Sequence, residues 1–164
     1  MPIETDVIAV IDDDPMIRHA LQKLLLALGY TVELYDSSEA FLQRAAACRA
    51  MCLLIDVQLG SSSGIELARQ LAKAGLKFPI MFMTANDDKA VQRQAIEVGC
   101  VGYLLKPFAA KTANEHLGRA ENRRAQTRLV CWRERADRLE AARHALPLAA
   151  VATGLTIRRL SAEN

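Results

Sequence analysis

Clustered aspartates at the ends of two apolar segments are the residues of this chain best suited to chemistry. Asp12–Asp14 follow the apolar run Val7–Ile11, and Asp56 ends a second apolar run, Met51–Ile55. Adjacent carboxylates repel one another, so a site that gathers them needs a cation, and hard oxygen ligands suit Mg²⁺. If the two runs are neighbouring strands, their carboxylates converge on one point. The sequence therefore predicts a magnesium site of the kind used in phosphoryl transfer.

Short apolar segments alternate with amphipathic segments from residue 6 to about 120. We predict strands at residues 7–11, 31–35, 52–55, 80–84 and 102–105. We predict helices at 16–28, from Ser37 or Ser38 to about 47, at 64–74, from Asp87 or Asp88 to 98, and from 109 to beyond 120. Strands that alternate with helices in this way indicate a doubly wound α/β fold, with a parallel sheet covered on both faces.

Polar residues end the other predicted strands as well. Thr84 ends the fourth strand and Lys106 follows the fifth. Each alone has an ordinary interpretation as a polar residue of a loop. In a doubly wound fold, however, the carboxyl ends of the strands form the binding edge of the sheet. We therefore expect Thr84 and Lys106 to lie near Asp12, Asp13 and Asp56.

Four motifs in order resemble the receiver domain of two-component response regulators, the CheY-like group. They are Ile11–Pro15, Leu54–Leu59 with Ser63–Gly64, Met83–Ala85 and Tyr103–Phe108. The resemblance extends from residue 6 to about 120. It implies a flavodoxin-like sheet of five parallel strands in the order 2-1-3-4-5, with five helices, and a receiver domain over residues 5–122.

The resemblance implies a phosphoprotein of two-component signal transduction rather than a turnover enzyme. Asp56 would accept a phosphoryl group from a phosphohistidine on a sensor histidine kinase. Asp13 and Asp56 would bind Mg²⁺ through their carboxylates, Gln58 through its backbone carbonyl, and Asp12 mainly through a coordinated water. Asp14 would be a solvated neighbour rather than a ligand.

The same resemblance implies a conformational switch. Lys106 would place its ammonium on the phosphoryl oxygens, and the Thr84 hydroxyl would bond another of them. Tyr103 would then rotate into the space that Thr84 leaves, although from the residues alone an ordinary packed aromatic is the better interpretation. The change would reshape the surface of the fourth helix, fifth strand and fifth helix, which the family uses for dimerisation or docking. Lys106-Pro107 resembles the cis-prolyl junction of the family.

One segment departs from the family pattern. Where the family usually places Pro after the acceptor motif, this chain has Gly60–Gly64, with three serines between the two glycines. Gly and Ser restrict the backbone less than Pro does, so we expect a more flexible loop here. The departure bears on the lifetime of the phosphoryl group rather than on the identity of the acceptor.

The C-terminal part of the chain differs in charge. Residues 1–109 carry 10 basic and 13 acidic side chains, and residues 110–164 carry 11 and 6. Residues 123–146 hold a heptad-like apolar stripe that includes Trp132, which indicates a helical linker, either a coiled coil or a helix folded back on its own domain. Residues 147–164 are faintly similar to the start of the helix-turn-helix output domain of the NarL/FixJ subclass.

That similarity leaves two interpretations of the tail. Either the chain is a truncated transcription regulator, or the tail serves dimerisation or partner binding. DNA would be a partner only with a complete output domain, because a reader of this class needs a recognition helix in the major groove. A homodimer would form through the surface of the fourth helix, fifth strand and fifth helix, or through the C-terminal helix.

Composition and the lengths of the apolar runs indicate the cellular compartment of the protein. The apolar runs are shorter than the roughly 20 residues of a membrane span, and the N-terminus lacks the features of a signal peptide, so we expect a cytoplasmic protein without a membrane partner. The four cysteines lack the paired spacing of zinc sites and fit a reducing compartment.

Three alternatives compete with a transcriptional switch. One is a stand-alone receiver or phosphate sink that acts by protein contacts. Another is a phosphatase of the haloacid-dehalogenase type, but Asp12–Pro15 puts proline where its D-x-D-x-[TV] motif would fail. A module that binds FMN would need a hydroxyl-rich phosphate loop where this chain has three aspartates, which would repel phosphate.

Overall fold

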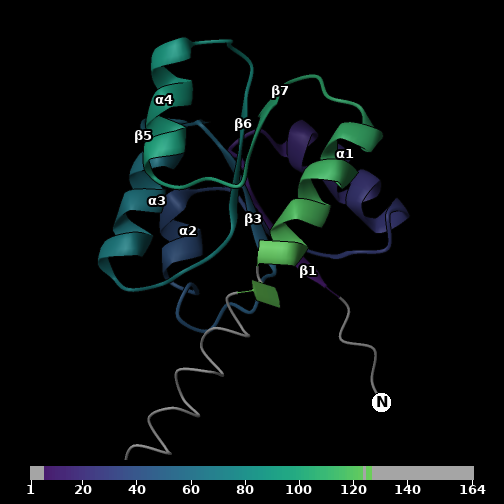
Figure 1. Ribbon diagram of the computed structural model, residues 1–164, viewed down its shortest axis with the longest axis horizontal. Coiled ribbons are helices and arrows are strands. Elements are labelled where there is room, and N and C mark those ends of the chain that lie inside the picture. Colours follow the sequence, from purple (N-terminus) through teal and green to yellow (C-terminus); the bar gives the residue numbers. More distant parts are fainter. Residues whose placement is uncertain (1–5, 124, 127–164) are drawn as a thin grey trace, which may run out of the picture. The chain divides into compact units, whose positions relative to one another are not determined.

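The computed structural model describes residues 6–123, 125 and 126, and these form a sheet with helices on both faces (Figure 1). The five parallel strands are β1 (Val7–Ile11), β2 (Thr31–Tyr35), β3 (Cys52–Asp56), β6 (Ile80–Thr84) and β7 (Gly102–Leu105). Their order in the sheet is β2-β1-β3-β6-β7. This confirms the predicted doubly wound fold and its strand order.

Two helical layers cover the sheet. The helices are α1 (Pro15–Ala27), α2 (Ser38–Leu42), α3 (Gly64–Lys73), α4 (Lys89–Glu97) and a final helix that runs over residues 110–123. In Figure 1, α2, α3 and α4 lie on one side of the strands, and α1 lies on the other side with the green final helix. The central strands β1, β3 and β6 therefore bury both of their faces, as their nearly continuous apolar sequence requires, while the edge strands β2 and β7 stay partly exposed.

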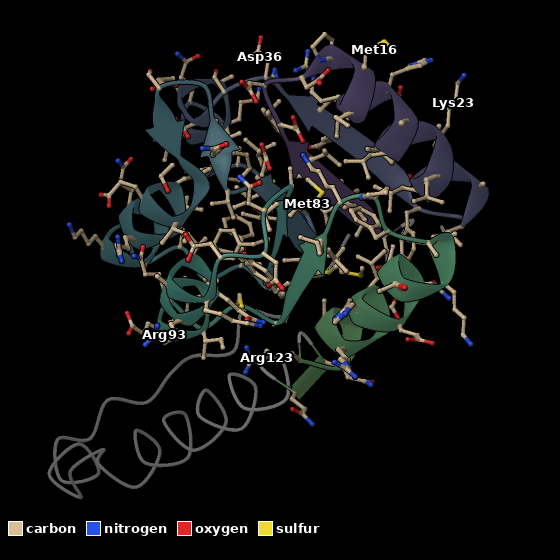
Figure 2. The ribbon with its side chains drawn as sticks, turned by 90° about the horizontal axis from the view of Figure 1, so that it is seen from above. Met16, Lys23, Asp36, Met83, Arg93 and Arg123 are labelled. Carbon is tan, nitrogen blue, oxygen red and sulfur yellow. The ribbon has the colours of Figure 1, made fainter. Side chains whose placement is uncertain are left out.

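Two apolar clusters hold the layers together. On one face, Phe41 of α2 and Leu67 of α3 pack with Phe82 of the sheet. On the other face, Leu25 of α1 and Leu117 of the final helix pack with further strand residues. Figure 2 shows Met83 of β6 in the interior, while Met16 and Lys23 of α1 point outward. Alternate strand residues thus enter opposite clusters.

The second helix is shorter than predicted. It ends at Leu42 rather than near residue 47. Beyond it the backbone N–H groups of Arg44, Ala45 and Ala47 donate to carbonyls three residues back rather than four. These are 3₁₀-type turns, whose hydrogen-bond geometry is poorer than that of an α-helix, so they rarely continue for long. Ala45 lies within them and is buried in the core.

The predicted helical linker over residues 123–146 and the tail over 147–164 lie outside the described residues, apart from residues 123, 125 and 126, which are helical. The stripe that includes Trp132 and the NarL/FixJ-like segment therefore stay predictions. In the part of the chain that the structure describes, no helix has the length and apolar character needed to cross a bilayer.

Two adjacent leucines of α1 provide a matched test of the fold. Leu25 is fully buried, and Leu26 is 54% exposed. We expect Leu25→Ala to lower the free energy of unfolding by about 2–5 kcal/mol, because it removes buried contacts and leaves a cavity. Leu26→Ala should change it by no more than about 0.5 kcal/mol. Urea unfolding followed by circular dichroism measures both, and equal losses would contradict the described orientation of α1.

Candidate functional site

Three predicted carboxylates converge at the carboxyl edge of the sheet. Asp12 follows β1 and Asp56 ends β3, and the pairing of Ile11 with Ile55 brings the ends of these strands level. One carboxylate oxygen from each of Asp12, Asp13 and Asp56 lies within 4.8 Å of the others. Oxygen donors in this arrangement fit a hard divalent cation such as Mg²⁺.

Lys106 joins the cluster from the end of β7. Its Nζ donates to Asp12 Oδ2 at 2.7 Å and to Asp56 Oδ1 at 3.2 Å. Burial by itself would lower the pKa of Lys106, but its hydrogen bond to Asp12 and the charge of Asp56 outweigh it, so the pKa is raised. The ammonium therefore stays charged between two carboxylates, where it offsets part of their repulsion.

Asp12 is held at every polar atom that the structure describes. Its Oδ1 accepts from the backbone N–H of Asp14 at 2.9 Å, and its Oδ2 accepts from Lys106. Its carbonyl accepts from Arg18 Nη1 at 2.7 Å, and its N–H donates to the Tyr35 carbonyl. Asp12 is 1% exposed. This carboxylate acts as a fixed anchor of the site.

Asp13 and Asp56 differ from Asp12 in their surroundings. The Asp13 side chain is exposed. Burial raises the pKa of the Asp56 carboxyl, Lys106 partly offsets the rise, and Asp12 adds to it. The net effect disfavours the ionised form of Asp56, chiefly because the carboxyl is partly buried. A bound cation would offset this effect.

Thr84 and Tyr103 are near the site but do not bond the acidic cluster. Thr84 is buried, and its Oγ1 donates to the Asn86 carbonyl and accepts from the Asn86 N–H, both at 3.2 Å. The Tyr103 hydroxyl is buried without a hydrogen-bond partner among the described residues. Burial raises the pKa of Tyr103, and Thr84 lowers it somewhat, although the two hydroxyls do not meet hydrogen-bond geometry.

Tyr103 therefore already points into the protein in this structure. Its ring packs beside the apolar cluster that faces α2, α3 and α4. Lys106-Pro107 is a cis peptide bond, as the resemblance implied.

Asp14 has a role that the sequence analysis missed. It is the N-cap of α1, and its Oδ1 accepts from the N–H groups of Met16 at 2.8 Å and Ile17 at 3.4 Å. The signal was present, because Asp before a proline at the first helical position is typical of a helix start. The bond from Arg18 to the Asp12 carbonyl had no comparable signal.

The acidic cluster lines an open hollow of about 440 Å³. Its walls are Asp12, Asp13, Asp14, Ile17, Asp56, Gln58, Gly60, Ala85 and Lys106. Gln58 belongs to β4 (Gln58–Leu59), which pairs with β5 (Ser62–Ser63) in a short antiparallel hairpin. The segment Gly60–Gly64 thus contains one strand of a paired hairpin on the rim of this hollow, and its predicted flexibility stays a prediction.

The raised pKa of Asp56 predicts a pH-dependent stability difference. The folded protein holds the Asp56 proton more tightly than the unfolded chain, so ionised Asp56 lowers stability as pH rises from its ordinary pKa of 3.8 through the raised folded value. In metal-free buffer, Asp56→Asn should therefore melt at a higher temperature than the wild type at neutral pH. Thermal melts in EDTA should show this gain shrinking toward acidic pH, and a variant less stable than the wild type throughout would contradict it.

Proteins of known family are similar in sequence to the described part of the chain. The model of the response regulator receiver domain family matches residues 8–117. The response regulator protein TodT of Pseudomonas putida is 33% identical over 108 residues, which cover 66% of this chain and 48% of TodT. The transcriptional regulatory protein FixJ of Bradyrhizobium diazoefficiens is 37% identical over 101 residues, which cover 62% and 49%. The chain thus matches about half the length of each of these relatives.

Solved structures agree with these sequence matches. A crystal structure of FixJ-N has a TM-score of 0.69 and 28% identity, covering 73% of this chain and 96% of that one. A low-resolution structure of the response regulator StyR has a TM-score of 0.73 and 30% identity, covering 88% and 72%. The family match extends over more than half of the sequence. The chain therefore belongs to the response regulator receiver domain family of two-component signalling.

Proposed function

We propose that the receiver domain is a phosphorylation-controlled switch in which Asp56 accepts a phosphoryl group from a phosphohistidine of a sensor histidine kinase. The observation that carries the proposal is the convergence of Asp12, Asp13 and Asp56 around Lys106. In the reaction an Asp56 carboxylate oxygen attacks phosphorus in line. The bond from phosphorus to the histidine nitrogen breaks, an acyl phosphate forms, and the imidazole leaves with the electron pair of that bond.

Asp13 and Asp56 would hold Mg²⁺ together with the Gln58 carbonyl, and Asp12 would reach it through water. The bound ion would supply positive charge to the phosphoryl oxygens, which is the main catalytic need of such a transfer. The exposed Asp13 side chain is suited to direct ligation. The Asp12 carboxylate already has two partners, which favours an indirect role.

Lys106 and Thr84 would act on the phosphorylated state. Lys106 now divides its bonds between two carboxylates, and a phosphoryl group on Asp56 would offer it a more strongly charged partner. The Thr84 hydroxyl would leave its turn with Asn86 and donate to another phosphoryl oxygen. Tyr103 is partly buried with its hydroxyl in the interior, and the movement of Thr84 would stabilise this inward orientation of the ring.

The donor histidine must approach past the surface beside the acidic hollow. A second hollow of about 450 Å³ lies there, with Lys106 in the walls of both. Its other walls are mainly apolar: Ile17, Ala20, Leu21, Leu24, Ala85, Pro107 and Phe108. A kinase helix with an apolar face would bury this surface and bring its phosphohistidine to Asp56.

We further propose that phosphorylation controls a homodimer, and through it transcription. Ile96 of α4 is 64% exposed and Leu105 at the end of β7 is 46% exposed, which gives the α4–β7 face apolar contacts for a second copy. Several relatives carry names of transcriptional regulators. DNA binding by this protein would need an output domain, and its cytoplasmic location stays a prediction from the sequence.

Other functions lack a supporting observation. Membership of the receiver family does not favour a haloacid-dehalogenase phosphatase or an FMN module. A stand-alone receiver or phosphate sink uses the same acceptor chemistry and differs only in what the phosphorylated form contacts.

Phosphotransfer tests the acceptor. Labelling by a phosphorylated histidine kinase, or by acetyl phosphate, should require Mg²⁺ and should fall to background in Asp56→Asn, because the amide cannot attack phosphorus. Asp36→Asn is a matched control, because Asp36 follows β2 at the same edge of the sheet and is exposed. Phos-tag gels measure the label, and equal labelling of Asp56→Asn and wild type would refute the assignment.

Gel filtration with beryllium fluoride and Mg²⁺ tests the output. We expect the wild type to dimerise, and Lys106→Ala to bind Mg²⁺ yet stay monomeric, because it lacks the cation that responds to the phosphoryl mimic.

The dimer face is tested in the same way. Ile96→Asp should stay monomeric while keeping its acceptor activity. Leu26→Asp, on the exposed side of α1, is the control. Dimers of Ile96→Asp as stable as those of the wild type would exclude the α4–β7 face.

A further inference from the structure

A glycine lies directly against the backbone of the acceptor residue. Gly64 is the first residue of α3 and is buried. A Cβ atom at this position would overlap the Asp56 carbonyl oxygen and would lie 2.6 Å from Ile55 Cγ2 and 3.1 Å from the Asp56 carbonyl carbon. Real side chains do not tolerate such approaches, so any residue but glycine must move one of the two segments.

The end of β3 is the segment less able to move. It is a central strand, with Ile55 paired to Ile11 of β1 and Asp56 paired to Met83 of β6. The Val57 N–H also donates to the Met83 carbonyl at 2.8 Å. A side chain at position 64 would therefore push the start of α3 outward rather than displace β3.

The start of α3 carries the β4–β5 hairpin with it. The Gly64 N–H donates to the Val57 carbonyl at 2.9 Å, so the hairpin is closed at its base by Gly64 itself. Gln58 pairs with Ser63, and the Ser63 hydroxyl accepts from the Ile65 N–H as the N-cap of α3. An outward shift of Gly64 would therefore also displace Gln58, which lines the acidic hollow.

The tip of the hairpin has its own supports. Ser62 Oγ donates to the Leu59 carbonyl at 3.0 Å and lies 3.3 Å from the hydroxyl of Ser38, at the start of α2. At the turn, Gly60 faces Asp13, since a Cβ there would lie 3.8 Å from Asp13 Oδ2. The hairpin thus links the backbone of Asp56, which Gly64 contacts, with the side chain of Asp13, which Gly60 faces.

We propose that Gly64 is a positioning residue of the acceptor site. Its missing side chain lets α3 close on the Asp56 carbonyl, and this contact sets the distance between the Asp56 carboxylate and the Gln58 carbonyl. The inference rests on the proposed function for its effect on phosphoryl transfer, while its effect on cation binding can be measured separately.

Three glycine substitutions test the proposal. Gly64→Ala should bind Mg²⁺ about 10- to 100-fold more weakly by calorimetry, the range typical when the support of metal ligands is lost. Its labelling by acetyl phosphate at saturating Mg²⁺ should slow by up to about 100-fold, as expected of a misplaced reacting group. Gly118→Ala, with open space around it in the final helix, should match the wild type in both.

Gly75→Ala separates positioning from general destabilisation. Gly75 has a φ of 74°, and no atom lies within 4 Å of the point where a Cβ would stand, so alanine there strains the backbone without touching the site. We expect a lower melting temperature with wild-type Mg²⁺ affinity. A Gly64→Ala protein that behaves in the same way, destabilised but with unchanged Mg²⁺ affinity and labelling, would overturn the proposal.

A pair of serine variants tests the proposal if Gly64→Ala does not fold. Ser63→Ala and Ser37→Ala each remove one serine N-cap, from α3 and α2 respectively. Both should lower the melting temperature, but only Ser63→Ala should weaken Mg²⁺ binding. Equal Mg²⁺ affinities of the pair would overturn the proposal. A wild type that binds Mg²⁺ but takes no label would instead refute the acceptor assignment and leave the Gly64 comparison valid.

Discussion

The ion pairs of Lys106 with Asp12 and Asp56 are the interaction on which the rest of the site depends. They join the ends of β1, β3 and β7, three strands that are far apart in sequence. Buried charges are unfavourable unless they are paired, so the two carboxylates and the ammonium require one another. The observed strand order brings the ends of these three strands to one edge of the sheet, where the groups can pair. The site therefore depends on this topology.

The apolar runs and their polar ends made most of this architecture predictable. Each strand of the five-stranded sheet was predicted within one residue of its observed bounds, because strands in a parallel sheet are short and mostly apolar. The strand order came from the family resemblance rather than from periodicity. The convergence of the acidic residues followed once the strands were placed side by side, since parallel strands end at a common edge.

Individual hydrogen bonds and close backbone contacts could not be predicted in the same way. Nothing in the sequence indicates that Arg18 bonds the Asp12 carbonyl, or that Thr84 is held by its own turn with Asn86. The β4–β5 pairing in the Gly- and Ser-rich segment was not predicted, because composition reports local backbone freedom and not pairing. Its hairpin depends on hydrogen bonds across the turn and on Gly64, whose importance appears only where α3 meets β3.

The central claim is that Asp13 and Asp56 share one divalent cation within reach of Lys106. Its most direct test is a crystal structure of the protein soaked in Mn²⁺, with the ion located by its anomalous scattering. The account predicts one strong peak bonded to both carboxylates and to the Gln58 carbonyl, with Lys106 still adjacent. A peak elsewhere, or carboxylates that keep only Lys106 as their partner at saturating Mn²⁺, would contradict it.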